Sequence, residues 1–209
     1  MTFLESRKKI KKLLNALLSD KPDTGLTPEL LGMSSSKLDE FYIKLDKVKH
    51  DIEQDIEFLF GNDPSAKEID EVRCHTSSFA VSAYRIAHIF PCAKTARAIT
   101  EFAKSITGID IHPGARIGVP FCIDHGVGTV IGETAVIGTR SMLYHGVTLG
   151  ARHLKERNQA GEDRHPKVGN NVIIYSNTTI LGNLNIPDGM IIGANKFIKS
   201  QEEVDALKR

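Results

Sequence analysis

Apolar residues in the first half of the chain recur with the period of an α-helix. Between residues 36 and 61 they are spaced by three or four, as on one buried helical face. These positions are Leu38, Phe41, Leu45, Val48, Ile52, Ile56 and Leu59. The serines before this run suit N-caps, Pro64 suits the start of another helix, and two more helices are expected near residues 77–90 and 94–107. We predict an N-terminal α-helical domain over residues 1–107.

From residue 108 the aliphatic pattern changes to a period of six, which belongs neither to a helix nor to a single strand. It forms three runs, separated by a two-residue slip and by a polar interruption. The runs are Ile111, Ile117 and Ile123; Ile131, Ile137, Leu143 and Leu149; and Val168, Ile174, Ile180, Ile186, Ile192 and Ile198. Six residues make a short strand and a turn, and three such units close a triangular coil with its aliphatic side chains inside. We predict a parallel β-helix over residues 108–200.

The polar interruption, ARHLKERNQAGEDRHP at residues 151–166, has no aliphatic period. It must leave the β-helix as a protruding loop, which is either a functional element or an ordinary solvated insertion. Residues 201–209 form a short C-terminal tail. The predicted fold class is therefore α+β: an N-terminal helical bundle followed by a β-helix with one protruding loop.

Charge and composition narrow the choice of partners. The chain has 27 basic and 26 acidic residues, a net charge of +1, and no basic footprint of a nucleic-acid binder. No run of eighteen apolar residues indicates a membrane span, and the lysine-rich N-terminus reads as an amphipathic helix with a solvated face rather than as a membrane-surface helix. Cys74, Cys92 and Cys122 form no CxxC pair, which fits a reducing compartment. We expect a cytoplasmic protein with no nucleic-acid or membrane partner.

Four motifs together resemble the serine O-acetyltransferases, a family of hexapeptide-repeat acyltransferases. They are DIHPGARIG at 110–118, IDHGVGTVIGETAVIG at 123–138, GVTLGA at 146–151 and DRHPKVGNNVIIYSNTTILGN at 163–183. The resemblance implies a left-handed β-helix, although ordinary crossover rules would favour the right hand. It also implies homotrimers, possibly joined as dimers of trimers through the helical domain. The implied reaction transfers acetyl from acetyl-CoA to L-serine, giving O-acetylserine for cysteine biosynthesis.

This reaction needs a base, because a serine hydroxyl is a poor nucleophile toward a thioester. Histidine suits the task, and a carboxylate can fix its tautomer and stabilise the imidazolium. The resemblance assigns His125 as general base and Asp110 as the orienting carboxylate. They are separated by nearly the length of one coil, so neighbouring coils could bring them together. The structural alternatives are a core histidine and a turn-closing aspartate.

The two charged ends of serine also need partners. The resemblance assigns its ammonium to Asp63 and Asp124, and its carboxylate to Arg164, whose planar guanidinium matches a carboxylate. His165 is the second loop contact. Because the loop protrudes, we expect the pocket to lie between adjacent subunits. Alternatively, Asp63 is only an N-cap and Arg164 only a solvent-exposed loop charge.

Acetyl-CoA is the expected co-substrate, and no metal is expected. In line with the resemblance, acetyl-CoA would lie in a groove between neighbouring β-helices, where small residues let its pantetheine arm approach the backbone. The residues at these positions are Gly150, Ala151, Ser176, Gly193 and Ala194.

Three features depart from the family pattern. The loop is longer than in short-loop members, position 145 is histidine where glutamine is expected, and no tail ending in isoleucine follows. The last point leaves a complex with cysteine synthase without support. The alternatives are another hexapeptide acyltransferase, a non-catalytic scaffold, or a zinc enzyme resembling γ-class carbonic anhydrases that uses His125, His145 and His165.

Overall fold

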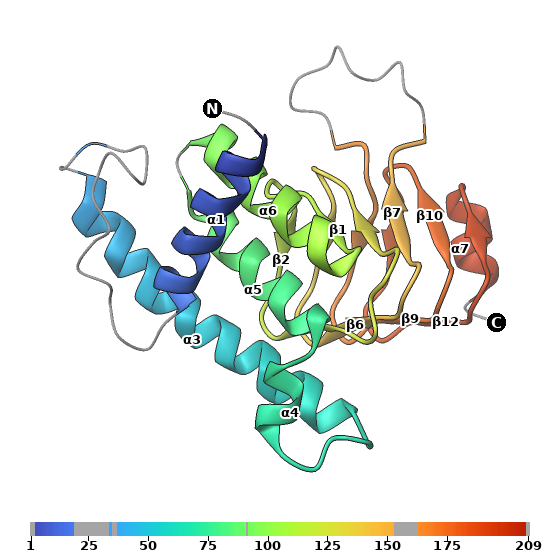
Figure 1. The fold of residues 1–209 in the computed structure, drawn as a ribbon. Coiled ribbons are helices and arrows are strands. Elements are labelled where there is room, and N and C mark those ends of the chain that lie inside the picture. Colours follow the sequence, from blue (N-terminus) through green and yellow to red (C-terminus); the bar gives the residue numbers. More distant parts are fainter. Residues whose placement is uncertain (1–2, 19–33, 35–36, 91, 153–162, 208–209) are drawn as a thin grey trace.

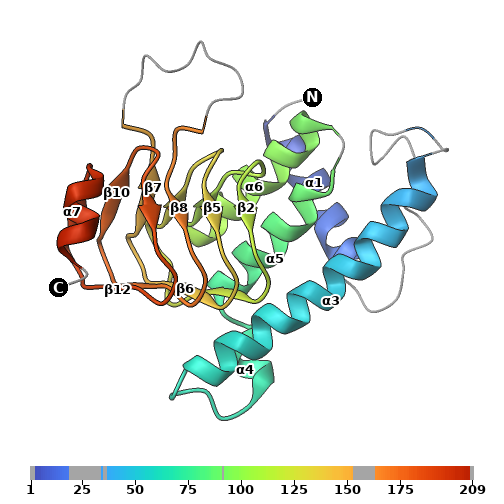
Figure 2. The ribbon, with the colours of Figure 1, turned by 180° about the vertical axis from the view of Figure 1, so that it is seen from behind.

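The computed structural model describes residues 3–18, 34, 37–90, 92–152 and 163–207 of the 209-residue chain. Helices form the N-terminal part and a stack of short strands forms the rest (Figure 1). The helices are α1 (Phe3–Leu18), α3 (Leu38–Asn62), α4 (Ile69–Arg73), α5 (Thr76–His88) and α6 (Ala93–Thr107), with α7 (Gln201–Ala206) following the strands. Seen from behind, α3 crosses α5 obliquely and α7 covers the far end of the β-helix (Figure 2).

The expected helices at 36–61, 77–90 and 94–107 are confirmed, with two differences at the termini. The N-cap of α3 is Lys37 rather than a serine, and Lys37 makes no side-chain cap bond. The helix expected at Pro64 begins instead at Ile69. The reason is a turn after α3, in which the Asp63 carboxylate accepts hydrogen bonds from the N–H and hydroxyl of Ser65 at 2.9 and 2.6 Å. This prediction was wrong because the side chain closes a turn that competes with the helix.

The helices share one apolar core and cover one face of the β-helix. The amphipathic face of α1, including Leu14 and Leu17, is buried in the same cluster as the apolar face of α3. Cys122 and Met142, which point outward from neighbouring coils, are buried in this cluster too. The helical domain therefore packs on the sheet to which these two residues belong.

The strands form three parallel sheets, in the orders β1-β4-β7-β10-β13, β2-β5-β8-β11 and β3-β6-β9-β12. Their bounds are β1 (Asp110–Ile111), β2 (Arg116–Ile117), β3 (Phe121–Ile123), β4 (Val130–Ile131), β5 (Val136–Ile137), β6 (Ser141–Leu143), β7 (Thr148–Gly150), β8 (Lys167–Val168), β9 (Ile173–Ile174), β10 (Thr179–Leu181), β11 (Asn185–Ile186), β12 (Ile191–Ile192) and β13 (Phe197–Ile198). Each strand pairs with the third strand after it in the chain, so three strands make one turn and the predicted triangular coil is confirmed.

Every aliphatic residue of the six-residue pattern is buried inside the β-helix. Small residues two positions earlier, such as Ala135 and Thr178, are fully buried as well, because they fill the corners. Asp110 pairs with Val130, whereas Val130 pairs with Thr148, so the first coil is longer than the second. The slip in the sequence pattern therefore places extra residues in the turn between β3 and β4.

Helix α7 closes the far end of the β-helix, in a segment to which the sequence pattern assigned no element. Ser200 and Glu203 form a capping box at its start, and Val204 is fully buried in the β-helix core. The Gln201 side-chain amide accepts a hydrogen bond from Asn185 N–H and donates one to Asn185 O, both at 3.0 Å. Residues 201–206 of the predicted tail thus form a helix that packs on the β-helix.

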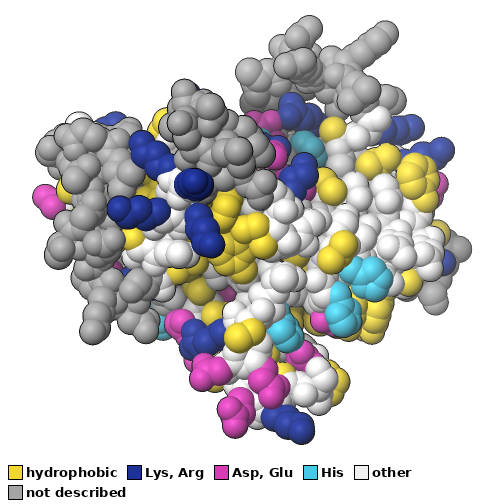
Figure 3. All heavy atoms as spheres, in the orientation of Figure 1, with side chains coloured by type: hydrophobic (Ala, Val, Ile, Leu, Met, Phe, Trp, Pro, Cys, Tyr) yellow, Lys and Arg dark blue, Asp and Glu magenta, His cyan; other side chains and the backbone are white. Residues whose placement is uncertain are grey.

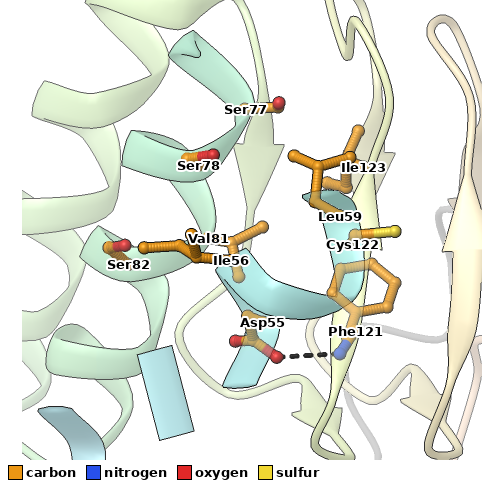
Figure 4. Close-up of a pocket in the computed structure, with 10 residues that line it drawn as sticks. All are labelled: Asp55, Ile56, Leu59, Ser77, Ser78, Val81, Ser82, Phe121, Cys122 and Ile123. Atoms are coloured by element: carbon orange, nitrogen blue, oxygen red, sulfur yellow. Dashed lines mark hydrogen bonds between the residues drawn. The ribbon is translucent and has the colours of Figure 1, made fainter. Parts of the chain in front are cut away.

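A buried ion pair joins the two parts of the chain. Arg85 of α5 donates to both oxygens of Asp55 on α3, from Nε at 2.8 Å and from NH2 at 3.1 Å. Asp55 also accepts from Phe121 N–H at 2.7 Å (Figure 4), and Arg85 donates to the carbonyls of Ile117 and Gly118. Burial raises the pKa of Asp55, and the hydrogen bonds from Arg85 and Phe121 oppose that rise. Helices and first coil therefore share one polar network.

Candidate active site

An open cleft of about 710 Å³ lies where the helices meet the β-helix. Four stretches of the chain line it: the turn after α3, the start of α5, the turn after β3 and the turn after β6. The lining residues are Asn62, Asp63, Pro64, Ser65, His75, Thr76, Ser77, Asp124, His125, Val127 and Tyr144. Acidic and histidine side chains gather on this part of the surface (Figure 3). The fold thus brings together three predicted site residues, Asp63, Asp124 and His125.

His125 occupies the enlarged turn between β3 and β4. Its backbone has φ of 58°, and its side chain is 74% exposed, so the alternative of a core histidine is wrong. Its Nε2 lies 3.8 Å from Oδ1 of Asp124, and its ring meets that of His145 edge-on, with centroids 5.9 Å apart. The imidazole is therefore accessible to a bound molecule and has a carboxylate beside it.

Asp110 lies on the coil next to this turn. Its N–H donates to Thr129 O at 2.9 Å, and Gly128 N–H donates to Gly108 O at 3.0 Å, so the β3–β4 turn runs beside the start of β1. The Asp110 carboxylate contacts Lys104 Nζ at 2.5 Å, and this contact raises the pKa of Lys104. The described contacts of Asp110 include no hydrogen bond to His125. The role of Asp110 as orienting carboxylate therefore stays a prediction.

Asp63 presents an ionised carboxylate to the cleft. Hydrogen bonds from the Ser65 hydroxyl and N–H lower the pKa of Asp63. Both bonds fall on Oδ1. Asp63 therefore closes a local turn and faces the cleft, so the structural and the functional interpretation hold together.

Arg164 and His165 lie at the opposite end of strand β4 from His125. The His165 ring is buried beside Gly132, and its Nδ1 lies 2.8 Å from the Thr134 hydroxyl. The Arg164 guanidinium forms an ion pair with Glu133. Strand β4 separates this turn from His125, so one chain does not gather all the predicted serine-binding residues. Most of the predicted loop, residues 153–162, lies outside the described residues.

The close packing of His165 on Gly132 gives a prediction. A Cβ added at Gly132 would lie 2.0 Å from Cδ2 of His165, so Gly132→Ala must displace that ring. If His165 contacts the substrate, the KM for the acceptor should rise about tenfold, measured by steady-state kinetics. Gly61→Ala is the matched control, because nothing lies within 4 Å of its added Cβ. Equal kinetics in both variants would remove His165 from the site.

The predicted cofactor residues fall into two groups. Four turns stack along the corner that connects the β3 sheet to the β1 sheet; we call residues 124–129, 144–147, 175–178 and 193–196 the His125 corner. Backbone hydrogen bonds join successive turns: Gly146 N–H to Val127 O at 3.0 Å, Asn177 N–H to His145 O at 2.9 Å, and Asn195 N–H to Ser176 O at 2.9 Å. Ser176, Gly193 and Ala194 therefore lie on the same corner as the candidate base. Gly150 and Ala151 lie at the other end of β7.

Sequence reasoning missed several residues of the cleft. Tyr144 lines it and stacks on Tyr175, with ring centroids 4.9 Å apart. The start of α5, with His75, forms another wall. The six-residue period offered a signal for Tyr144, since it follows Leu143 as Asp124 follows Ile123. No comparable signal pointed to His75.

The zinc alternative finds no support within one chain. Among the residues that the structure describes, no three histidine, cysteine or acidic side chains are grouped to hold a metal ion. His125 and His145 are adjacent, but His165 lies at the other end of strand β4.

In the described part of the chain, no helix is both long and apolar enough to cross a bilayer.

Comparisons with known proteins decide the family. No family model matches the chain. It is 38% identical over 181 residues to the plasmid serine acetyltransferase of Synechococcus elongatus, covering 82% of this chain and 57% of that protein. It is 42% identical over 148 residues to the serine acetyltransferase of Staphylococcus aureus, covering 69% of this chain and 67% of that protein. The chain belongs to the serine acetyltransferase family.

The solved structures of this acyltransferase family agree. The Neisseria gonorrhoeae serine acetyltransferase is 31% identical and has a TM-score of 0.69, with 92% of this chain and 71% of that chain covered. A second structure of that enzyme, in complex with serine, has a TM-score of 0.63 at 29% identity and covers 91% of this chain and 79% of that chain. The fold is the left-handed parallel β-helix that the family resemblance implied. The chain spans little more than half the length of the Synechococcus relative.

Proposed function

We propose that this serine acetyltransferase family member transfers acetyl from acetyl-CoA to the hydroxyl of L-serine. The product, O-acetylserine, would serve cysteine biosynthesis. The single observation that supports this most is the shared cleft, in which Asp63 and Asp124 face the same space as His125. Two carboxylates suit an ammonium group, and an exposed imidazole beside them suits proton removal from a neighbouring hydroxyl.

The reaction follows from this arrangement. Asp63 and Asp124 bind the ammonium of serine, which turns the hydroxyl toward His125. The imidazole takes the hydroxyl proton while the serine oxygen attacks the thioester carbonyl carbon. A carboxylate beside the ring then stabilises the imidazolium, and Asp124, 3.8 Å from Nε2, is placed to help Asp110 in that role.

The serine carboxylate requires a cation, and Arg164 is the candidate. Because Arg164 and His165 lie at the opposite end of β4 from His125, we propose that a neighbouring copy of the chain supplies them. A homotrimer, alone or paired as a dimer of trimers, would close the site in this way. Acetyl-CoA would lie along the His125 corner, past Ser176, Gly193 and Ala194.

The free cysteines Cys74, Cys92 and Cys122 fit a protein of the reducing cytoplasm.

The acceptor is tested by a panel assay. Purified protein is mixed with acetyl-CoA and single hydroxyl compounds, and the released thiol is measured. Serine should react at least about tenfold faster than homoserine, threonine or a simple sugar, because both charged ends and the hydroxyl must fit at once. Equal rates across these acceptors would favour another hexapeptide acyltransferase. A protein that binds no acetyl-CoA would be a scaffold.

The ammonium site gives a second prediction. Asp63→Asn removes a charge that should pair with the substrate, so the KM for serine should rise about ten- to a hundredfold while kcat changes little. Asp46→Asn, on an exposed position of α3, is the charge-matched control. If both variants keep the original KM, Asp63 closes its turn and does nothing more.

A further inference from the structure

Two cations on helix α6 reach the Asp110 carboxylate, the candidate partner of the base. Lys104 Nζ donates to Oδ2 of Asp110 at 2.5 Å, and Arg97 NH1 lies 3.8 Å from Oδ1. The chain turns back here because Gly108 ends α6 with φ of 71° and its N–H donates to Lys104 O at 2.8 Å. The last turn of α6 is therefore fixed beside the start of β1, and the helical domain contacts a candidate catalytic group directly.

The two oxygens of this carboxylate have different partners. Oδ2 is bonded to Lys104, whereas the described residues place no hydrogen bond on Oδ1, because 3.8 Å to Arg97 is beyond hydrogen-bond distance. Arg97 also pairs with Glu101. A carboxylate accepts hydrogen bonds at both oxygens, so Oδ1 stays available to an imidazole N–H while Lys104 holds Oδ2.

Several elements bring charged or titratable groups to Asp110 and His125. They are Arg97, Glu101 and Lys104 on α6, His112 after β1, Asp124 and His145 beside His125, and Asp63, His75 and Tyr144 in the cleft. Of the two cations on α6, Lys104 is the closer to Asp110. The hydrogen bond with Asp110 raises the pKa of Lys104, so this ammonium stays charged at neutral pH.

We propose that Lys104 is a positioning residue for the acetyl transfer. By bonding Oδ2, its ammonium fixes the plane of the Asp110 carboxylate so that Oδ1 accepts a hydrogen bond from the His125 ring. Its charge also opposes protonation of that ring, which leaves more of the imidazole free to act as a base. The proposal rests on the proposed function and adds to it a group of the helical domain that acts on the base through Asp110.

The test compares Lys104→Met and Lys104→Arg with the unaltered protein in serine acetylation across pH. The methionine variant keeps an apolar stem without the charge, so kcat should fall about tenfold as the carboxylate loses its fixed plane. The acidic limb of the kcat/KM profile should move about half a unit to higher pH, because a positive charge near the base is gone. The arginine variant keeps a charged donor, so its kcat should stay within about threefold and its acidic limb should not move.

Lys94→Met, on an exposed position of the same helix, is the matched control and should keep the original kcat and pH profile. Melting temperatures report folding. Because the Lys104 side chain is exposed at the surface, they should hardly change, and Lys104→Gln decides if the methionine variant does not fold.

A second readout needs no substrate. In NMR titrations of histidine-labelled protein, the His125 ring signal is assigned by its loss in His125→Ala. Its titration midpoint should move about half a unit to higher pH in Lys104→Met and stay in place in Lys104→Arg. If the unaltered protein does not acetylate serine, the proposed function fails, and this titration still decides whether Lys104 acts on His125.

Three results would overturn the proposal. One is a methionine variant whose kcat and titration midpoint equal those of the unaltered protein. Another is a methionine variant with a higher kcat, since Lys104 would then hold Asp110 away from His125. The third is an equal loss of kcat in the methionine and arginine variants with no movement of either pH readout, which would make the role of Lys104 merely structural.

Discussion

Replacing His125 with alanine should lower kcat for serine acetylation by about a hundred- to ten-thousandfold. The exposed imidazole in the cleft is the proposed general base, and its removal would leave the serine hydroxyl to lose its proton to water. The fold should be unaffected, because this side chain is 74% exposed and lies in a turn. Stopped assays of released thiol, with saturating acetyl-CoA and serine, measure the loss.

The matched control is His50→Ala, on an exposed position of α3 away from the cleft. It should keep the original kcat. Equal melting temperatures of the two variants would show that any difference in rate comes from chemistry. A His125→Ala protein that acetylates serine at the original rate would exclude an imidazole base at this position.

Replacing Asp55 with alanine should lower the free energy of unfolding by about 3–5 kcal/mol, the range found when one partner of a buried ion pair is removed. The Arg85 guanidinium would stay buried without its carboxylate, and Phe121 N–H would lose its acceptor. Urea denaturation monitored by circular dichroism gives the value. Because the network joins α3, α5 and the first coil, helices and β-helix should unfold together.

Two comparisons make this result specific. Lys44→Ala breaks the exposed ion pair with Glu40 and should cost at most about 0.5 kcal/mol. The double variant Asp55→Leu with Arg85→Met should recover part of the loss, since an apolar pair removes both charges together. If Asp55→Ala is as stable as the original protein, the ion pair contributes nothing to the stability of the contact between the helices and the β-helix.

Periodicity alone was enough to predict most of the architecture. A period of six is rare, and each aliphatic residue on it is buried as the triangular coil requires. Local side-chain chemistry was harder to predict, as the helix start expected at Pro64 shows: the bond from Ser65 to Asp63 makes a turn there. A pattern of apolar residues does not report which polar side chain closes a turn.

The site was predicted only as far as motif order allowed. The family resemblance assigned Asp124 and His125, which are neighbours in the chain, and also Asp63, which the fold brings to the same cleft. The contact of Lys104 with Asp110 was not foreseen, because it depends on how α6 meets the first coil. The ion pair of Asp55 and Arg85 was missed for a similar reason, since these residues lie on helical faces that read as ordinary polar positions.

The Gln201 amide has a consequence for solubility. A stack of parallel strands ends in a row of unsatisfied N–H and C=O groups, and such an edge is a template for strands of other molecules. Gln201 bonds to both backbone groups of Asn185, and Val204 covers the apolar interior. The short helix thus keeps β11 from pairing with a strand of another molecule. Its loss would expose this end of the β-helix and favour aggregation there.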